Sequence, residues 1–378
     1  MRARLAGDFE RFRTELPGAF PEHVRETYRI DLTARYLGFT LPHPIGKGSG
    51  QLSLNLEQLE ADRAAGLAFA VLKTVIAEDP EGGRSMGAWA VHESRMLVER
   101  RLSAAGRDGW TVTWKGRGWD RPFTEYLALA RAAGDLTRDG ALVAVPSVKY
   151  HLPRLEESFR MTEYRHTSTA LSQAWGGAPL PLEVDFSPTL AGDALADERG
   201  RILRWLREVP AQVRATAPGP VRLALKLMNA RFDDGFQVEM VQAAAGADAL
   251  VLFNRLWDPE RGVAYGGYDL SERNLRVLDA VGRRAGPPRT GTGNVGSGRM
   301  VLEYARRGCE SVQLHTFFQL PLMAYPASAG SRTARALHAL VFDPADGLIR
   351  GMLDLEEAGV IARTGGELRF LDLCGTPP

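Results

Sequence analysis

Short apolar runs alternate along the chain with longer amphipathic stretches. Apolar runs of about four to eight residues are typical of strands buried on both faces, and apolar residues spaced three or four apart are typical of helices. Alternation of the two predicts a parallel sheet with crossover helices. The predicted strands are residues 44–48, 69–75, 142–148, 182–186, 221–227, 249–253, 289–291 and 312–314. The predicted helices between them are residues 54–65, 123–133, 202–215, 238–245, 272–284 and 299–307.

Eight predicted strands with helices between them favour an α/β fold, a single (β/α)8 TIM barrel. We expect the barrel to span residues 39–330. A helical extension over residues 1–38, with a hairpin at 32–41, would form a lid over the barrel floor. Residues 331–378 would form a helical tail with a short strand pair. Residues 76–121 are a long insertion after the second strand, and its tryptophans argue against disorder, so we expect it to serve the active site.

The charge balance and the cysteine content exclude several classes of function. With 47 basic and 46 acidic residues the net charge is +1, which gives no electrostatic footprint for nucleic acid or an anionic membrane. No apolar run is long enough to span a bilayer, and residues 1–20 lack the apolar core of a signal peptide, so we expect a cytoplasmic protein. The two cysteines, Cys309 and Cys374, form no CxxC pair. That excludes a cysteine-ligated zinc or iron–sulfur site within the chain, and we expect no bound metal.

The glycine-rich string Gly291-Thr-Gly-Asn-Val-Gly-Ser-Gly298 lies between a predicted strand and a predicted helix. Glycines at such a junction expose backbone N–H groups, and the helix N-terminus adds positive partial charge, so the string predicts a phosphate site. The string also fits GxGxxG, but a dinucleotide fingerprint needs an apolar strand before it and an acidic residue at the end of the next strand. Here Ala285-Gly-Pro-Pro precedes the string and Glu310 comes before the next strand, which argues against a dinucleotide site.

Five further motifs follow one another along the predicted strands. They are Gly48-Ser49-Gly50, Leu72-Lys73-Thr74-Val75, Leu225-Lys226-Leu227, Ala247-Asp248-Ala249 with Asn254, and Tyr265-Gly266-Gly267. In type and order they resemble the dihydroorotate dehydrogenase-like FMN barrels, a family that includes the FMN-binding part of dihydropyrimidine dehydrogenase. The resemblance covers about residues 30–325 and implies a TIM barrel that binds FMN.

The resemblance also implies which residues hold FMN. Lys73 and Lys226 each end an apolar strand, where a charge is costly unless it meets a partner. A cation beside the pyrimidine edge would stabilise the reduced, anionic flavin, and by resemblance Lys226 takes that place, with Lys73 near flavin and substrate. The expected residues near the ring are Gly48, Ser49, Gly50, Lys73, Thr74 and Lys226. Those expected at the phosphate are Gly267, Gly293, Asn294, His315 and Thr316, with the His315 imidazolium assisting.

The catalytic base departs from the family pattern. The family carries Asn-x-Ser-Cys-Pro-Asn or Ser-Ser-Pro-Asn after the fourth strand, and its Cys or Ser takes a proton as hydride leaves for the flavin. Here Ser187, before a proline, is the nearest equivalent. The Asn before it is replaced by Asp185 or Val184, and the Asn after it by Thr189. We expect Ser187 to be the base, acting with Lys73, although Ser-Pro is also a common turn.

The substrate loop departs from the family as well. Where the family has Asn-x-x-Gly-x-x-Asn, this chain has Trp114-Lys-Gly-Arg-Gly-Trp-Asp120. Trp114 could stack on a ring while Lys115 and Arg117 clamp an anionic group, which argues against orotate as the substrate. Asn254 could hydrogen-bond a substrate carbonyl or simply end its strand. The tryptophans could instead form a small aromatic core that holds the loop down, or contact a second subunit in a homodimer.

Together these observations predict an FMN-dependent oxidoreductase of the dihydroorotate dehydrogenase type. It would move a hydride between flavin N5 and a C–C (C=C) unit of a small planar substrate that is pyrimidine-like or bears a carboxylate or amide. A separate electron acceptor would complete the cycle. Two alternatives stay open: a phosphate-binding TIM-barrel isomerase or lyase without flavin, whose glycine loops grip the substrate's own phosphate, and a flavin-binding protein without turnover.

Overall fold

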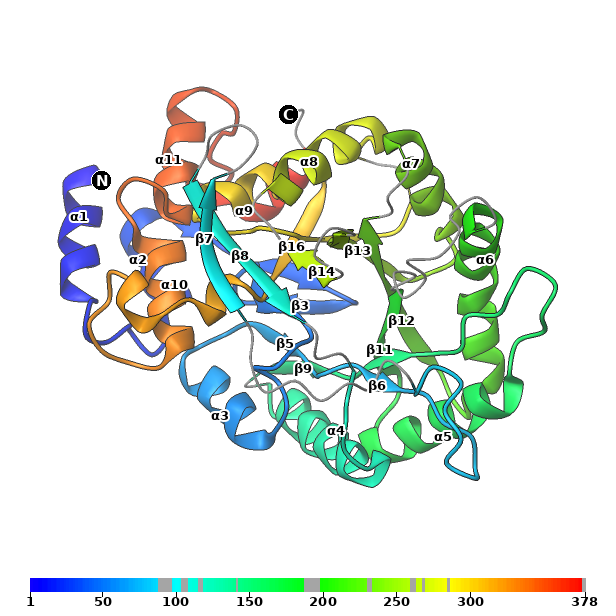
Figure 1. Cartoon of the computed structure of the whole chain (residues 1–378). Helices are drawn as coiled ribbons and strands as arrows, with labels where there is room; N and C mark the ends of the chain where they lie inside the picture. Colours follow the sequence, from blue (N-terminus) through cyan, green and yellow to red (C-terminus); the bar gives the residue numbers. More distant parts are fainter. Residues whose placement is uncertain are drawn as a thin grey trace.

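A computed structural model of the chain describes residues 1–87, 97–102, 108–114, 118–140, 142–186, 198–229, 233–258, 263–266, 269–283 and 286–375. Its centre is a curled sheet of ten parallel strands with helices on the outside, a barrel-like α/β fold (Figure 1). The strands are ordered β6-β10-β11-β12-β13-β15-β16-β4-β5-β9. Their bounds are β4 Ile45–Lys47, β5 Phe69–Val71, β6 Val75–Ile76, β9 Val143–Val145, β10 Ser147–Lys149, β11 Leu180–Phe186, β12 Val221–Asn229, β13 Ala249–Asp258, β15 Arg289–Thr292 and β16 Cys309–Leu314.

All eight predicted strands are confirmed, and two of them are interrupted. Residues 72–74 separate β5 from β6, and Pro146, which has no N–H to donate to a neighbouring strand, separates β9 from β10. In the first gap the backbone stays hydrogen-bonded to the neighbouring strand β9, because the N–H of Leu72 donates to the carbonyl of Val145 at 2.9 Å. The gap contains Lys73, so one expected site residue lies where the strand departs from regular pairing.

Helices separate successive strands and pack around the sheet (Figure 1). Side-chain caps define several of their starts: Asn55 accepts from the N–H of Gln58, and Asp233 from that of Phe236. All six predicted helices are confirmed to within a few residues, and α5 lies where no helix is predicted. The helices are α3 Leu56–Ala64, α4 Phe123–Arg138, α5 Met161–Trp175, α6 Glu198–Thr216, α7 Asp234–Ala243, α8 Asp269–Val281, α9 Gly298–Ala305 and α10 Arg332–Phe342. After β16 come the short helices η3 Phe317–Gln319 and η4 Leu322–Ala324.

The two ends of the chain pack against each other. The N-terminal elements are α1 (Arg2–Arg11), α2 (Phe20–Tyr28) and β1 (Ile30–Asp31), and the C-terminal ones are α11 (Leu348–Glu357), β17 (Leu368–Arg369) and α12 (Phe370–Gly375). β1 and β17 pair in parallel, and Arg25 donates to both carboxylate oxygens of Glu367 at 2.9–3.1 Å. The strand pair expected within the tail is therefore made of one strand from each end of the chain.

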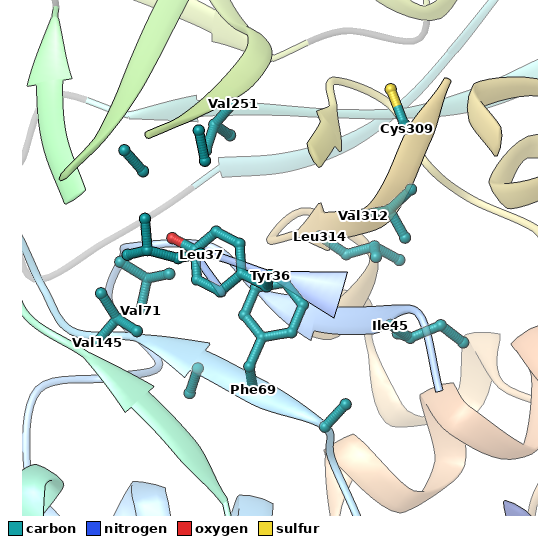
Figure 2. Packing of buried hydrophobic residues seen from close by; sticks show 14 of the residues in the cluster. Tyr36, Leu37, Ile45, Phe69, Val71, Val145, Val251, Cys309, Val312 and Leu314 are labelled. Atoms are coloured by element: carbon teal, nitrogen blue, oxygen red, sulfur yellow. The ribbon is translucent and has the colours of Figure 1, made fainter. Parts of the chain in front are cut away.

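The predicted hairpin at residues 32–41 is confirmed as β2 (Ala34–Tyr36) and β3 (Phe39–Leu41). Leu37 and Gly38 both have positive φ, at 47° and 80°, which is the backbone that a two-residue hairpin turn requires. Tyr36 enters the core and stacks on Phe69 with 4.4 Å between ring centroids, among buried aliphatic side chains (Figure 2). The hairpin lies at the amino-terminal ends of the strands, where the carbonyl of Gly38 accepts from Arg222.

The insertion after the second strand carries a second hairpin, β7 (Leu97–Leu102) and β8 (Asp108–Trp114). β8 pairs with β14 (Val263–Gly266), which in turn pairs with β13 (Figure 1). The end of the insertion is held by Trp119, which is buried and lies edge-on to Tyr126. Its backbone N–H donates to the carbonyl of Thr74 at 2.7 Å, and its indole N–H donates to the carbonyl of Pro122 at 3.1 Å. For Trp119 the structure supports the aromatic-core interpretation.

Gly298 tests how tightly the C-terminal helix α11 packs against α9. A Cβ at Gly298, the first residue of α9, would lie 2.0 Å from the backbone nitrogen of Leu348 at the start of α11. We expect Gly298→Ala to lower the free energy of unfolding by about 1–3 kcal/mol, because backbone atoms must move. Urea denaturation followed by circular dichroism measures this.

Gly7 provides the matched control, because it also lies in a helix, α1, and a Cβ there would meet nothing within 4 Å. Gly7→Ala should raise the unfolding free energy by about 0.5–1 kcal/mol. Equal midpoints for the wild type and Gly298→Ala would contradict the packing described for α9 and α11.

Candidate functional site

A buried polar network lies inside the curled sheet. Lys226, on β12, donates its ammonium to Glu183 Oε1 at 3.2 Å and to Gln313 Oε1 at 3.0 Å. The other oxygen of Glu183, Oε2, accepts from Gln313 Nε2 at 2.6 Å and from the hydroxyl of Tyr36 at 2.8 Å. All four side chains are at most 4% exposed. Lys226 was expected in the site, whereas the other three side chains of the network were not.

The proton of the Tyr36 hydroxyl is held firmly in this network. Burial raises the pKa of Tyr36 well above its usual value, and the nearby Glu183 carboxylate raises it further. Tyr36 therefore stays protonated and acts as a donor to Glu183. Gln313 can then use its amide N–H for Glu183 and its carbonyl for Lys226, which fixes the orientation of the amide.

Glycines bring the backbone of the first strand close to the network and to His315. A Cβ at Gly48 would lie 3.5 Å from the ammonium nitrogen of Lys226, and one at Gly50 would lie 1.7 Å from Nε2 of His315. Between them, the Ser49 hydroxyl lies 2.8 Å from that of Thr74. The structure therefore brings together the expected residues from the carboxyl ends of β4, β5–β6, β12 and β16.

Cationic side chains converge at the same ends of the strands. Lys73 is buried, and burial together with the nearby Arg255 lowers its pKa well below the usual range, while Asp120 and Asp185 act against that shift. The pKa of His315 is also well below its usual value, first through burial and then through the charges of Arg255 and Lys73. Like charges so close together favour binding of an anion.

The expected imidazolium at His315 is therefore wrong, because these surroundings keep the ring neutral near pH 7. The side-chain nitrogen of Gln319 lies 2.9 Å from both ring nitrogens, which holds the ring in place. Thr316 follows as the residue that precedes η3 and is half-buried.

The glycine-rich loop after β15 is shaped by two side chains from the flanking helices. Asn274, on α8, is fully buried, and its amide nitrogen lies 3.0 Å from the carbonyl of Phe253 and 2.8 Å from that of Thr292. Tyr304, on α9, donates to the carbonyls of Thr292 and Gly293. Gly293 has φ of 104°, and a Cβ there would lie 2.3 Å from the Asn274 amide, so both the backbone angle and the space require glycine. The sequence gives no signal for Asn274 or Tyr304, because each is an ordinary residue of an amphipathic helix.

The N-terminus of α9 is occupied by the chain itself. The N–H of Arg299 donates to the carbonyl of Asp346, that of Met300 to the Ser297 hydroxyl, and that of Val301 to the Ser297 carbonyl. A phosphate here would therefore meet the loop before the helix, at Gly293 and Asn294, rather than the first turn. Asn294 has φ of 50° and donates its side chain to Ser271, so its backbone conformation is held in place.

The remaining expected residues are placed only in part. Asn254 is half-buried at a register shift in β13, and its carbonyl accepts from Asn229 at 2.7 Å. The backbone of Trp114 pairs with Ala264, which brings the end of β8 beside the Tyr265-Gly266 segment. Four expected residues lie outside the described part of the chain: Ser187, Gly267, Lys115 and Arg117.

A scan against models of protein families finds no match to this chain, and a search of curated proteins finds no match either. Within the described residues, no helix is both long and apolar enough to cross a membrane. The same part of the chain holds no group of three or more His, Cys, Asp and Glu side chains arranged to bind a metal ion.

The convergence of cations predicts a specific pH behaviour of His315. In NMR titrations of the histidine rings, we expect His315 to stay neutral at pH 7 and its pKa to rise when inorganic phosphate or FMN is added, because an anion offsets Lys73 and Arg255. His43 is the internal control: it is buried away from these cations, bonded to Gly66 and Ile45, and burial lowers its pKa to about 4. Its titration should not respond to the anion, and an unchanged His315 would contradict an anion site here.

The lowered pKa of each of these two histidines also sets a trend in stability. Both histidines have a lower pKa folded than unfolded, so unfolding takes up protons as pH falls below 6.5. We therefore expect the free energy of unfolding to fall between about pH 6.5 and 4, where His43 reaches its folded value. Urea denaturation at a series of pH values measures the trend, and His43→Gln should reduce its slope, leaving the contribution of His315.

Proposed function

We propose that the protein is an FMN-dependent oxidoreductase built on a single closed (β/α)8 barrel. The two interrupted strands support the barrel: counted as one strand each, β5 with β6 and β9 with β10 leave eight strands, and β16 pairs with β4. Each of these strands is followed by one of the helices α3 to α10. In barrels of this kind, ligands bind at the carboxyl ends of the strands, where the expected residues gather.

The observation that carries the proposal is the buried ammonium of Lys226, which would lie 3.5 Å from a Cβ built at Gly48. An ammonium is costly to bury, and its position beside a glycine is what recognition of a flat, electron-accepting ring would need. Two of its three N–H bonds go to Glu183 and Gln313, and within the described residues the third has no partner, so it can donate to a ligand. These residues fit the pyrimidine edge of FMN.

The phosphate of FMN would be bound by the loop at Gly293 and Asn294, together with His315, Thr316 and Gly267. Support comes from the fixed shape of the loop and from the cations around His315. Ring contacts would come from Ser49, Gly50 and Thr74, whose backbone and hydroxyls lie beside Gly48.

When bound, FMN supplies hydride acceptance or donation at N5, and the chain supplies charge and proton handling. Lys226 and Lys73 would stabilise negative charge at the ring and the substrate. By resemblance Ser187 would handle the substrate proton. By residue type, Asn254 would hydrogen-bond a substrate carbonyl, Trp114 would stack on the substrate ring, and Lys115 and Arg117 would bind an anionic group. The substrate class that follows is a small planar molecule with a carboxylate or amide, oxidised or reduced at a C–C (C=C) unit, with a separate electron acceptor.

Comparison of FMN with riboflavin, which lacks the phosphate, tests the proposal. We expect the protein to bind FMN with visible flavin absorbance, and to bind riboflavin at least about 100-fold more weakly, because charge-assisted hydrogen bonds contribute about 1.5–3 kcal/mol each. Absorbance and isothermal titration measure both affinities. A colourless protein that takes up inorganic phosphate but no FMN would favour the phosphate-binding isomerase or lyase instead.

Turnover separates an enzyme from a flavin-binding protein. We expect the photoreduced protein to be reoxidised by small acceptors under anaerobic conditions, at a rate that depends on the acceptor. Reoxidation by none of a panel of quinones, nicotinamides and unsaturated amides would favour a protein without turnover.

A further inference from the structure

The carboxylate of Glu183 is held by hydrogen bonds from several sides. It lies on β11, is fully buried, and accepts from three side chains that come from three other elements: Lys226 on β12, Gln313 on β16, and Tyr36 on the β2–β3 hairpin. Each donor approaches within 3.2 Å. A carboxylate held from several sides has one fixed position, and so does the cation bonded to it.

We propose that Glu183 is a positioning residue that fixes the ammonium of Lys226 and sets the positive charge that this site presents to its ligand. The proposal rests on the proposed function, since the ligand in question is FMN. Tyr36 acts through Glu183, because it donates to Oε2 and leaves Oε1 for Lys226. Gln313 donates to the same Oε2 and also accepts directly from Lys226.

The consequence for a bound flavin follows from charge alone. Lys226 and Glu183 form an ion pair at 3.2 Å, and their opposite charges partly cancel, so the site favours a reduced, anionic ring less than an isolated ammonium would. Replacing the carboxylate by an amide of the same shape removes the negative charge and keeps an oxygen that can accept from Lys226. The affinity for reduced FMN should then rise relative to that for oxidised FMN.

The first arm of the test uses the protein without FMN. In a double-mutant cycle of E183Q and K226M, each single change leaves a buried group without its charged partner and should raise the unfolding equilibrium constant at least tenfold. The double variant should raise it by clearly less than the product of the two single increases. If the free-energy changes of the two single variants simply add up in the double variant, the positioning role is wrong, whether or not the protein binds FMN.

The second arm measures the midpoint potential of bound FMN in wild type, E183Q and E163Q. We expect E183Q to favour reduced over oxidised FMN by at least about tenfold, a positive shift of about 30 mV for a two-electron couple. Glu163 is the matched control: it is also buried, but it accepts from the backbone N–H groups of His151 and Ser85. E163Q should keep the wild-type potential.

The outcomes separate the two proposals. If wild type binds no FMN, the proposed function fails, and the double-mutant cycle alone decides whether Glu183 positions Lys226. If FMN binds and E183Q leaves the potential unchanged or shifts it negative, the charge-setting role of Glu183 is wrong while the flavin function stands. An equal shift in E163Q and E183Q would also overturn it, since the effect would then not be specific to the Lys226 pair.

Discussion

A pair of opposite charges inside the sheet is the constraint on which the candidate site depends. Lys226 and Glu183 are both withdrawn from water, and an ion left alone there costs several kcal/mol. Each is therefore hydrogen-bonded to the other and to neutral side chains, Gln313 for both ions and Tyr36 for the carboxylate. A change in any of these four side chains alters the bonding of the others. The network thus gives the interior one arrangement, where a purely apolar core could tolerate several.

The glycines around this network fall into two groups with different physical roles. At Gly46 and Gly298 the space that a side chain would need is filled by other parts of the core: the ring of Phe69 beside Gly46, and the backbone at Gly347–Leu348 beside Gly298. At Gly48, Gly50 and Gly293 the nearest atoms are polar side-chain atoms: Gln313 Oε1 and Lys226 Nζ at Gly48, His315 Nε2 at Gly50 and the Asn274 amide nitrogen at Gly293. Only the second group keeps backbone close to groups that can bind a ligand. Their position at strand ends, rather than their number, is therefore what marks the site.

The strands and most helices could be predicted because they are long enough to show a period, and Lys73 and Lys226 could be predicted because a charge that ends an apolar run is unusual. Glu183 and Gln313 could not be predicted, because a single polar residue within a strand is what the usual alternation of polar and apolar positions produces. Tyr36 could not be found because its partner lies far away in sequence and local pattern carries no information about it. The pairing of β1 with β17 is beyond sequence analysis for a related reason: strands of two residues have no period to detect.

The hairpin expected to be a lid shows how a segment outside the barrel strands can govern the interior. Its two-residue turn, with positive φ at Leu37 and Gly38, aims Tyr36 inward, and stacking on Phe69 holds the ring there. The hairpin follows β1, which is fixed to the other end of the chain through β17, with Arg25 and Glu367 beside them. The Tyr36 hydroxyl that donates to Glu183 is thus held in place by contacts between the first and last parts of the chain. Because the position of Lys226 depends on Glu183, the geometry at the carboxyl ends of the strands depends in turn on packing at the opposite end of the sheet.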